Sequence, residues 1–397
     1  MRLSHRAAFY LQASIILFFL AGSSAATPLY AVYQAAWGFS SITVTIVFGV
    51  YALAVLSALL VTGSLSDYLG RRPVLIAAAL LQAVAMLVFA TAGGLGALIA
   101  ARVIQGLSTG AASSAVGAGL LDLDRPRGTL ANSIGPMLGT ATGGLASGLM
   151  VQYLPWPTHL VYGVLGAIFV VQAIGVWRMP ETVTRRPGAL ASLRPQFQLP
   201  RAARAPMLLA VPALVASWAL VGFYASLGPS LLRGMTGSRS LVLGGVGLFL
   251  LAAGGVVAVL TMRAATPRTL LTGGMAALLT GTAILLLAIA APVAVALPVF
   301  VVGALIAGAG FGAGFQGAIR SVVPLASASE RAGVLSILYV VSYLAMGVPA
   351  VLGGLRCTYG GGVATTAREY GVAVILLAAA ALIGTVRRSR AVAAIAV

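Results

Sequence analysis

The sequence has little charge, and its few titratable residues exclude several classes of protein. Only 8% of the 397 residues are charged, against about 25% in a typical soluble domain. Six residues are acidic and two are histidine, so a catalytic constellation at membrane depth is missing. The single cysteine, Cys357, excludes an internal disulfide and offers no metal-ligand spacing. We therefore expect no enzyme, no metal site and no cofactor.

Negative charge is especially scarce. Against the six acidic residues stand 24 basic residues, all arginine, and the formal net charge is +18. Such a charge could attract nucleic acid. However, the arginines lie in short connectors between apolar runs, without the interleaved aromatic residues of a nucleic-acid-binding surface. We expect no nucleic-acid partner.

Hydrophobic residues dominate what is present, at 60% of the chain, with a mean hydropathy of +1.06. A helix needs about 20 apolar residues to cross a bilayer. The first run follows Arg2 and Arg6 and is expected to be a span rather than a secretion signal. An all-α integral membrane protein with twelve spans is predicted, near residues 8–30, 42–62, 74–92, 95–120, 130–151, 158–177, 207–229, 241–262, 269–290, 293–319, 332–352 and 371–386.

The distribution of arginine predicts an orientation in the cell membrane. If alternate connectors are cytoplasmic, they hold 19 of the 24 basic residues, four lie outside, and Arg102 falls within a span. This bias puts both termini in the cytoplasm. The longest polar stretch follows the sixth span and indicates three parts: an N-terminal six-helix bundle (1–177), a cytoplasmic linker (178–206) and a C-terminal six-helix bundle (207–397).

The twelve-residue stretch "GSLSDYLGRRPV", which contains three charged residues, separates spans two and three. Its glycine, acidic residue, second glycine and basic pair resemble the signature of the major facilitator superfamily in this loop, at Gly63, Asp67, Gly70, Arg71 and Arg72. The connector at 261–268 keeps arginines but has no acidic residue. The resemblance, most like the twelve-helix drug or sugar efflux branch, implies two six-helix bundles around a central cavity. It also implies secondary active transport of a small molecule by alternating access.

Within this loop the glycines permit a tight turn, and Asp67 can accept hydrogen bonds from a helix N-terminus or pair with arginine. A second acidic partner for Arg71 is expected at Asp122 or Asp124, at the end of span four. The resemblance implies a cytoplasmic gate that latches the two halves together. The alternative is a topogenic signal that only keeps positive charge inside.

Arg102 in the fourth span is costly, by about 2.5 to 3.5 kcal/mol for a charge at the centre of a membrane helix. Together with Gln105 and Gly106 it matches the superfamily's pattern in that helix, which the resemblance links to proton coupling. The alternative is that Arg102 lies near the outer end of the span and extends to the lipid headgroups.

The fifth span carries Gly135, Pro136 and Gly139, which bend a helix and allow close packing. This is similar to the antiporter motif of exporters in the family, although Ala131 and Thr140 stand where that motif has glycines. Small-residue packing without any role in export is the alternative.

No carboxylate is expected at membrane depth, because the six acidic residues fall in connectors or at span ends. A strongly cationic substrate would lack a counter-charge, so neutral, weakly polar or anionic cargo fits better. In this family spans one, four, seven and ten, with their neighbours, line the central path. Their candidate cavity residues are Gln12, Asn132, Trp218, Tyr224, Phe315, Gln316, Tyr339 and Tyr343.

These observations predict proton-coupled efflux of small amphipathic or weakly polar molecules by a monomer in the lipid bilayer. An uptake permease or facilitator for a small metabolite is the alternative within transport. A non-transporting sensor built on a transporter scaffold is a more remote one.

Overall fold

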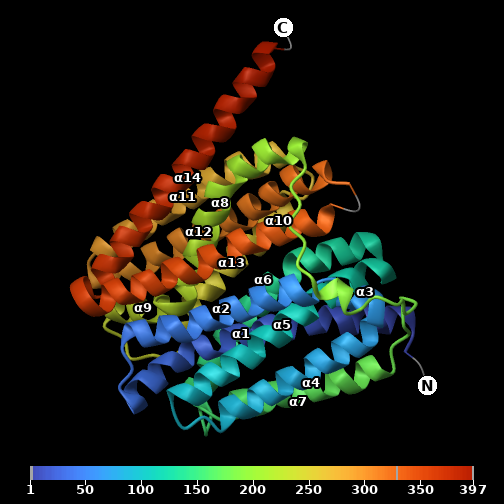
Figure 1. The fold of residues 1–397 in the computed structure, drawn as a ribbon. Coiled ribbons are helices and arrows are strands. Elements are labelled where there is room, and N and C mark those ends of the chain that lie inside the picture. Colours follow the sequence, from blue (N-terminus) through green and yellow to red (C-terminus); the bar gives the residue numbers. More distant parts are fainter. Residues whose placement is uncertain (1–2, 328–329, 396–397) are drawn as a thin grey trace. The chain divides into compact units, whose positions relative to one another are not determined.

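The computed structural model describes residues 3–327 and 330–395, and within these residues every regular element is a helix. The helices, drawn in Figure 1, form two compact units. Unit 1 comprises the described residues up to Phe39, Ile46–Gln196 and Ser240–Val246. Unit 2 comprises Ser40–Thr45, Phe197–Arg239 and the described residues from Gly247 onward.

Unit 1 is built mainly from the first seven α-helices and one short 3₁₀ helix. Their bounds are α1 (His5–Trp37), α2 (Ser41–Thr62), α3 (Leu65–Leu69), α4 (Arg71–Ala90), α5 (Leu95–Leu123), α6 (Arg125–Tyr153), α7 (Leu160–Trp177) and η1 (Ala191–Leu193). Helix α1 begins where the Ser4 hydroxyl accepts the Ala7 N–H at 3.2 Å, and it ends at Gly38 in the left-handed conformation.

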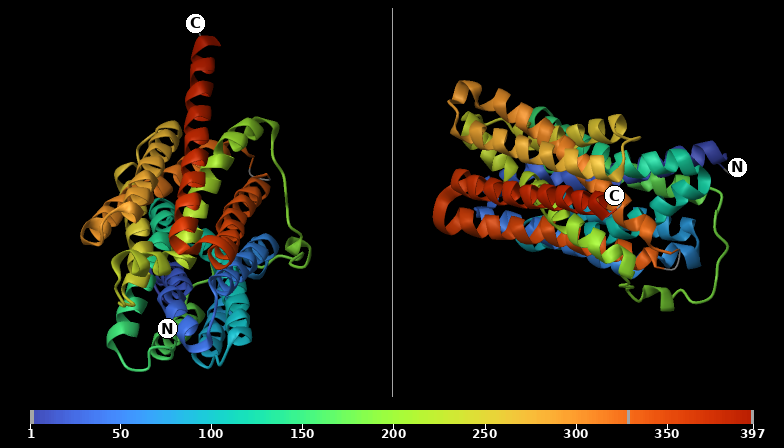
Figure 2. Two further views of the ribbon diagram at one scale, coloured as in Figure 1. Left: turned by 90° about the vertical axis from the view of Figure 1, so that its left-hand side faces the viewer. Right: turned by 90° about the horizontal axis from the view of Figure 1, so that it is seen from above.

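Unit 2 holds the remaining helices. Their bounds are α8 (Arg201–Ser226), α9 (Gly228–Thr236), α10 (Leu243–Thr261), α11 (Pro267–Ala290), α12 (Val293–Val322), η2 (Val323–Leu325), α13 (Arg331–Arg356), the π-helical turn η3 (Cys357–Gly361) and α14 (Gly362–Ile395). Helices α11 and α12 pack closely, because Gly281 lies directly against the backbone of Ala307. Helix α14 projects beyond its neighbours in this unit (Figure 2).

Eleven apolar helical stretches in the described residues are long enough to cross a membrane, and the last is long enough to cross it twice. This stretch, Arg331–Arg387, has 57 residues and would measure about 85 Å if straight, against a hydrocarbon core of about 30 Å. The chain instead turns back at Gly362, whose φ is +67°. Arg356 therefore pairs with Glu369 at 2.8 Å, although 13 residues separate them. Counted as two, this stretch completes the twelve expected spans.

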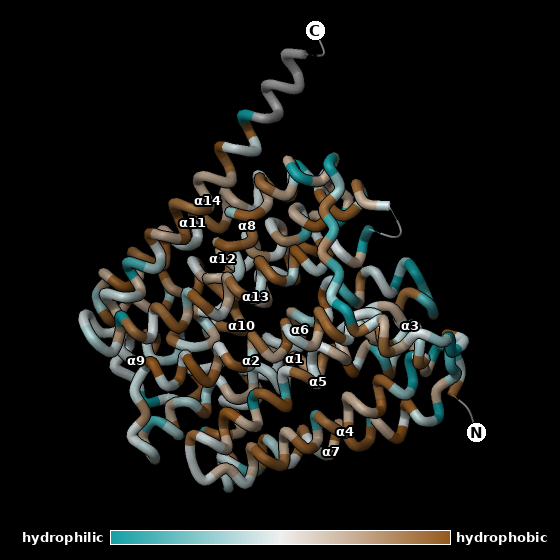
Figure 3. Tube along the Cα trace, viewed as in Figure 1, coloured by the Kyte–Doolittle hydropathy of each residue, from teal (hydrophilic) through white to brown (hydrophobic). Residues whose placement is uncertain are grey.

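Hydrophilic residues gather on connecting segments, notably around α3 and the polar stretch after α7 (Figure 3). The helices differ from the expected spans in their ends. Helix α1 continues to Trp37 rather than residue 30, and α8 begins at Arg201 rather than 207. The short helices α3 and α9 were not expected, because neither is long enough to leave a hydropathy signal.

Candidate functional site

A cluster of charged residues forms where α4 begins. Arg71 is the first residue of α4, and its charged side chain is buried. Its Nη1 donates to Asp67 Oδ1 of α3 at 2.5 Å and to Ser66 Oγ at 2.7 Å, and its Nε donates to Asp122 Oδ2 of α5 at 3.1 Å. Two carboxylates and a hydroxyl therefore hold one guanidinium between three helices.

The structure selects Asp122 over Asp124 as the second acidic partner of Arg71. Asp124 is the N-cap of α6, where its side chain accepts the Arg127 N–H at 3.0 Å. It also pairs with the exposed Arg127 side chain at 3.6 Å. Asp124 therefore stabilises the start of a helix and takes no part in the Arg71 cluster.

Glu181 completes the cluster, and sequence reasoning missed it. Its carboxylate accepts the backbone N–H groups of Arg71 at 2.8 Å and Arg72 at 3.1 Å. These are two of the unpaired donors at the N-terminus of α4, where a negative charge is favourable. Gly70 makes this approach possible, because its φ is +96° and a Cβ there would lie 2.9 Å from Glu181 Cδ. The available signal was an acidic residue directly after span six.

The first part of the polar linker packs on the same loop. The Arg186 N–H donates to Tyr68 O at 3.0 Å, and Ser64 Oγ donates to Ser192 O at 3.1 Å. Thr182 Oγ1 donates to Asp122 Oδ2 at 3.1 Å. Gly63, at the end of α2, lies where a Cβ would press on the Leu59 carbonyl. Within unit 1 the loop is thus held by α5 and by the polar stretch after α7.

Arg102 is the second buried guanidinium of unit 1. Its side chain is 1% exposed, which excludes the expected alternative that it extends to lipid headgroups. It donates to Tyr30 OH from Nε at 3.1 Å and from Nη2 at 2.5 Å, to Gln105 Oε1 at 2.6 Å and to Ser23 O at 3.0 Å. All these acceptors are neutral.

Three aromatic rings also face the Arg102 guanidinium, at 5.5 Å for Tyr30, 5.1 Å for Tyr51 and 5.6 Å for Phe89. The adjacent Gly106 lets α2 approach α5, because a Cβ there would lie 2.5 Å from Ala54 Cβ. The predicted group therefore joins α5 to two helices, because Arg102 and Gln105 bond to α1 and Gly106 packs on α2. Sequence reasoning did not identify Tyr30, which lies 72 residues away in the sequence.

The small residues of α6 form its interface with α1. A Cβ at Gly135 would lie 2.9 Å from Ile16, and Gly139 rests on the backbone of Leu17. Helix α6 continues through Pro136 without interruption. This contact fits close packing, and a role for Gly135, Pro136 and Gly139 in export stays a prediction.

The two cavity candidates of unit 1 make contacts within that unit, with Gln12 buried and Asn132 half-buried. Gln12 is 0% exposed, and its Nε2 donates to Met179 Sδ at 3.3 Å. Asn132 Nδ2 donates to Gly117 O at 2.8 Å, which joins α6 to α5. The side-chain oxygens of Gln12 and Asn132 are buried without a hydrogen-bond partner.

In unit 2 an aromatic cluster forms around Trp218 of α8. The Trp218 ring lies 5.4 Å from Phe315, 5.6 Å from Phe311 and 5.8 Å from Tyr343, measured between ring centroids. Trp218 Nε1 is buried and has no hydrogen-bond partner. Three of the predicted residues therefore meet here, joined by Phe311, which was not predicted although it lies one helical turn before Phe315.

The other predicted cavity residues of unit 2 make no ring contact with the Trp218 cluster. Tyr224 is 3% exposed and packs against Phe300 at 5.8 Å, in a separate pocket. Gln316 is 9% exposed, and Tyr339 is half-buried. At the start of α13, hydrogen bonds from the Ser327 hydroxyl and N–H lower the pKa of the Glu330 carboxyl below its ordinary value.

Known proteins resemble this chain in sequence and in fold. A sequence profile of the Major Facilitator Superfamily matches residues 13–297. The Multidrug resistance protein MdtL of Klebsiella pneumoniae (strain 342) is 32% identical over 180 residues, a match that spans 41% of this chain and 45% of that protein.

Solved structures of low sequence identity share the fold. A bacterial homologue of the human lysosomal transporter Spinster, in an inward-facing and unoccupied conformation, has a TM-score of 0.74 at 15% identity, covering 96% of this chain and 97% of its own. The nucleoside transporter NupG has a TM-score of 0.72 at 12% identity, covering 96% and 100%. The profile match spans most of the sequence, and the chain belongs to the Major Facilitator Superfamily of membrane transporters.

Proposed function

We propose that this transporter is a proton-coupled exporter of small, amphipathic or weakly polar molecules. The aromatic cluster around Trp218 is the observation that carries this proposal. It offers ring faces and an unpaired indole N–H, the combination that suits an apolar molecule with one or two acceptor groups.

The positions of the carboxylates favour cargo without a strong positive charge. The six acidic residues lie in α3, in the last turn of α5, at the N-caps of α6 and α13, after α7 and near the start of α14. A cation at membrane depth would therefore lack a counter-charge. Neutral or anionic amphipaths meet no such penalty.

Export rather than uptake is favoured by two observations. The glycine and proline pattern of α6 is similar to the antiporter motif of exporters, and in the structure these glycines set the contact with α1. The relative that matches part of the chain is named as a multidrug resistance protein. Both support efflux of drug-like molecules as the proposed direction.

We assign two roles in unit 1. The cluster of Asp67, Arg71, Arg72, Asp122 and Glu181 is proposed to form the cytoplasmic gate, because its charges can exchange partners when the helix ends move. Arg102 is proposed to contribute to proton coupling by fixing α5 to α1 through Tyr30 and Ser23. Any proton carried by a carboxylate would then bind at the gate cluster.

Transport in liposomes tests the function. The purified protein is reconstituted with an imposed pH gradient, and a panel of antibiotics, sugars and neutral, anionic and cationic amphipaths is offered. We expect gradient-dependent movement of neutral or anionic amphipaths, and its loss in Trp218→Ala. Gradient-independent equilibration of a sugar or metabolite would support the facilitator, and no movement of any compound would support the sensor.

We also propose that both termini are cytoplasmic and that the protein works as a monomer. Accessibility tags at Ser4 and after Arg390 should be labelled only in permeabilised cells, whereas a tag between Arg356 and Tyr370 should be labelled in intact cells. Labelling of either terminus from outside would overturn the orientation.

A further inference from the structure

The start of α8 and the C-terminal part of α14 lie side by side in unit 2. Tyr370 OH, near the start of α14, donates to Ala219 O of α8 at 2.8 Å. Further along α14, a Cβ at Gly384 would lie 3.0 Å from Leu209 Cδ2, near the start of α8. The two helices therefore run antiparallel, and α8 begins at the end of the unit where α14 leaves it.

Helix α14 carries an exposed apolar stripe that ends in arginine. Leu376 is 64% exposed and Ile383 is 51% exposed, and Arg387, four residues further on, is exposed as well. Residues four or seven positions apart lie on the same face of a helix. This face thus changes from hydrocarbon to positive charge.

Helix α8 repeats the pattern with the opposite chain direction. Leu208 is 74% exposed, and the exposed residues Arg204 and Arg201 precede it by four and seven positions. These spacings also keep the side chains on one face. Both helices therefore present arginine beyond an exposed apolar residue at the same end of the unit.

The two faces point to the same side of the helix pair. Leu208 and Ile383 each precede the contact residue of their own helix by one position, a rotation of about 100°. Because the helices are antiparallel, these equal rotations turn both side chains to one side. Arg204 lies five residues from the contact and Arg387 three, about 7.5 and 4.5 Å along the axes. Their guanidinium groups can therefore reach one common anion.

These arginines have no acidic partner. In the described part of the chain, Arg201, Arg204 and Arg387 form no salt bridge and no side-chain hydrogen bond. The acidic residues of unit 2 bond elsewhere, Glu330 at the start of α13 and Glu369 near the start of α14. The positive charge at this end is therefore open to an external anion.

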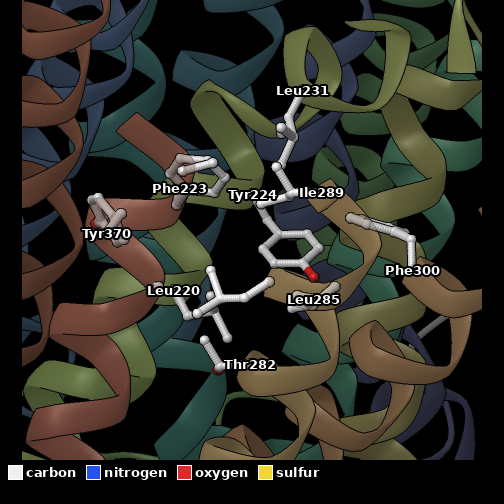
Figure 4. A pocket seen from close by; sticks show the side chains of 13 residues that line it. Leu220, Phe223, Tyr224, Leu231, Thr282, Leu285, Ile289, Phe300 and Tyr370 are labelled. Atoms are coloured by element: carbon white, nitrogen blue, oxygen red, sulfur yellow. The ribbon is translucent and has the colours of Figure 1, made fainter. Parts of the chain in front are cut away.

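The space between the helices is too small for a hydrocarbon chain. Tyr224 of α8 and Tyr370 of α14 line a cavity between α8, α9, α11, α12 and α14 (Figure 4), and its volume is about 30 Å³. A cavity of this size admits about one or two water molecules. An amphipathic partner of α8 and α14 must therefore lie on their exposed face.

We propose that the exposed face of α8 and α14 binds one anionic phospholipid. Its phosphate group lies between Arg201, Arg204 and Arg387, whose N–H groups donate charge-assisted hydrogen bonds. Its acyl chain lies along Leu208 and Ile383 and gains apolar contact. A free phosphate ion would gain nothing from these apolar residues. The site requires neither a particular cargo nor a direction of transport, so the inference does not rest on the proposed function.

Native mass spectrometry of the full chain in detergent tests the proposal. Dioleoyl phosphatidylglycerol is the anionic probe, and dioleoyl phosphatidylcholine is the zwitterionic one. We expect one phosphatidylglycerol to bind the parent more tightly than phosphatidylcholine does. Binding should weaken at least about tenfold in the triple variant, because each arginine contributes up to about fivefold. This triple variant combines Arg201→Gln, Arg204→Gln and Arg387→Gln.

A matched control removes the same charge from other helix ends and connectors. It replaces three exposed arginines, by Arg125→Gln, Arg127→Gln and Arg263→Gln. Its affinity for phosphatidylglycerol should match that of the parent. If the triple variant aggregates on gel filtration, Arg387→Gln alone is used, with an expected loss of about two- to fivefold.

A phosphatidylglycerol that carries a diazirine on one acyl chain locates the lipid. Irradiation should label the peptides that contain Leu208 and Ile383, and the triple variant should lose this labelling. Glycerol 3-phosphate carries the phosphate without acyl chains. It should not compete at about a hundredfold excess, because the apolar contact is missing.

Two outcomes would overturn the proposal. Equal affinity for phosphatidylglycerol in the parent, the triple variant and the control would mean that these arginines serve only to orient the chain in the membrane. Competition by glycerol 3-phosphate, or by inorganic phosphate at the same excess, would mean that the arginines bind a soluble anion and that the apolar stripe takes no part.

Discussion

The two units bury different kinds of side chain. Unit 1 encloses two guanidinium groups, Arg71 at 6% and Arg102 at 1% exposure, and gives each of them several acceptors. In unit 2, as far as the chain is described, no charged side chain is buried. Its interior instead holds aromatic rings and hydrogen-bond donors that have no partner, such as Trp218 Nε1. This difference supports the two proposed roles, charge-dependent switching in unit 1 and binding of uncharged molecules in unit 2.

The same contrast appears in two connectors, before α4 and before α11, that the six-plus-six pattern makes equivalent. The connector before α4 brings together three carboxylates and Arg71. The connector before α11 uses a threonine hydroxyl, since Thr266 Oγ1 accepts the Thr269 N–H at 3.2 Å, and Arg320 Nη1 donates to Arg263 O at 2.9 Å. Breaking the first connector should therefore affect switching, and breaking the second should affect only stability.

The largest effect is expected from Arg102→Ala. The change removes four hydrogen bonds and leaves Tyr30 and Gln105 buried with fewer partners. We expect uphill transport to be lost and the free energy of unfolding to fall by about 3 kcal/mol, with insertion into the membrane retained. Thermal unfolding in detergent and gradient-driven transport measure the two. Arg102→Lys keeps the charge but lacks the planar guanidinium, so its stability and transport should lie between those of the parent and Arg102→Ala. Normal uphill transport in Arg102→Ala would contradict the coupling role.

Gly70→Ala comes next, at about 2 kcal/mol of destabilisation. A Cβ strains the left-handed backbone and displaces the Glu181 carboxylate from the N-terminus of α4. Gly38→Ala is the matched control, because its φ is +67° and nothing lies within 4 Å of the added Cβ. It should cost about 1 kcal/mol. Equal shifts in melting temperature for both variants would mean that Glu181 adds nothing to α4.

Asp122→Asn and Asp124→Asn separate two acids that are neighbours in sequence. Asp122→Asn removes a counter-charge from buried Arg71 and should slow turnover, with about 1 to 2 kcal/mol of destabilisation. Asp124→Asn keeps a good N-cap for α6 and should resemble the parent. If turnover falls equally in both, the position of Asp122 against Arg71 is irrelevant to the gate.

The smallest effect is expected in the unit 2 connector. Thr266→Ala removes the hydroxyl that caps α11 and should lower stability by about 1 kcal/mol without changing turnover. Thr266→Ser restores the cap and serves as the control. A marked loss of turnover in Thr266→Ala would remove the contrast between the two connectors.

Sequence reasoning reached the spans and the Arg71 loop because both depend on local signals. A run of about 20 apolar residues predicts a crossing wherever the chain then goes. The acidic partners of Arg71 were harder to predict. Asp122 and Asp124 are only two residues apart, yet at the end of α5 Asp122 faces Arg71 and Asp124 caps α6. Glu181 lies 110 residues from Arg71, so only the fold brings them together.

The aromatic residues show the same limit. Trp218, Phe315 and Tyr343 were predicted only as candidates for one cavity, and in unit 2 the Phe315 and Tyr343 rings pack against Trp218. Tyr224 was expected in the same group but faces another pocket, because six residues separate it from Trp218 and rotate it around α8. Composition identifies which residues are candidates, and helix rotation decides which of them share a site.

The most direct test of the contrast between the units is the initial rate of efflux against concentration of a neutral amphipath. If unit 2 holds the cargo as proposed, Trp218→Ala should raise KM by about tenfold with little change in the maximal rate. If the Arg71 cluster of unit 1 sets the exchange between states as proposed, Asp67→Asn should lower the maximal rate by about fivefold with KM retained. The reverse pattern, or equal effects of both variants on both constants, would contradict this division of roles.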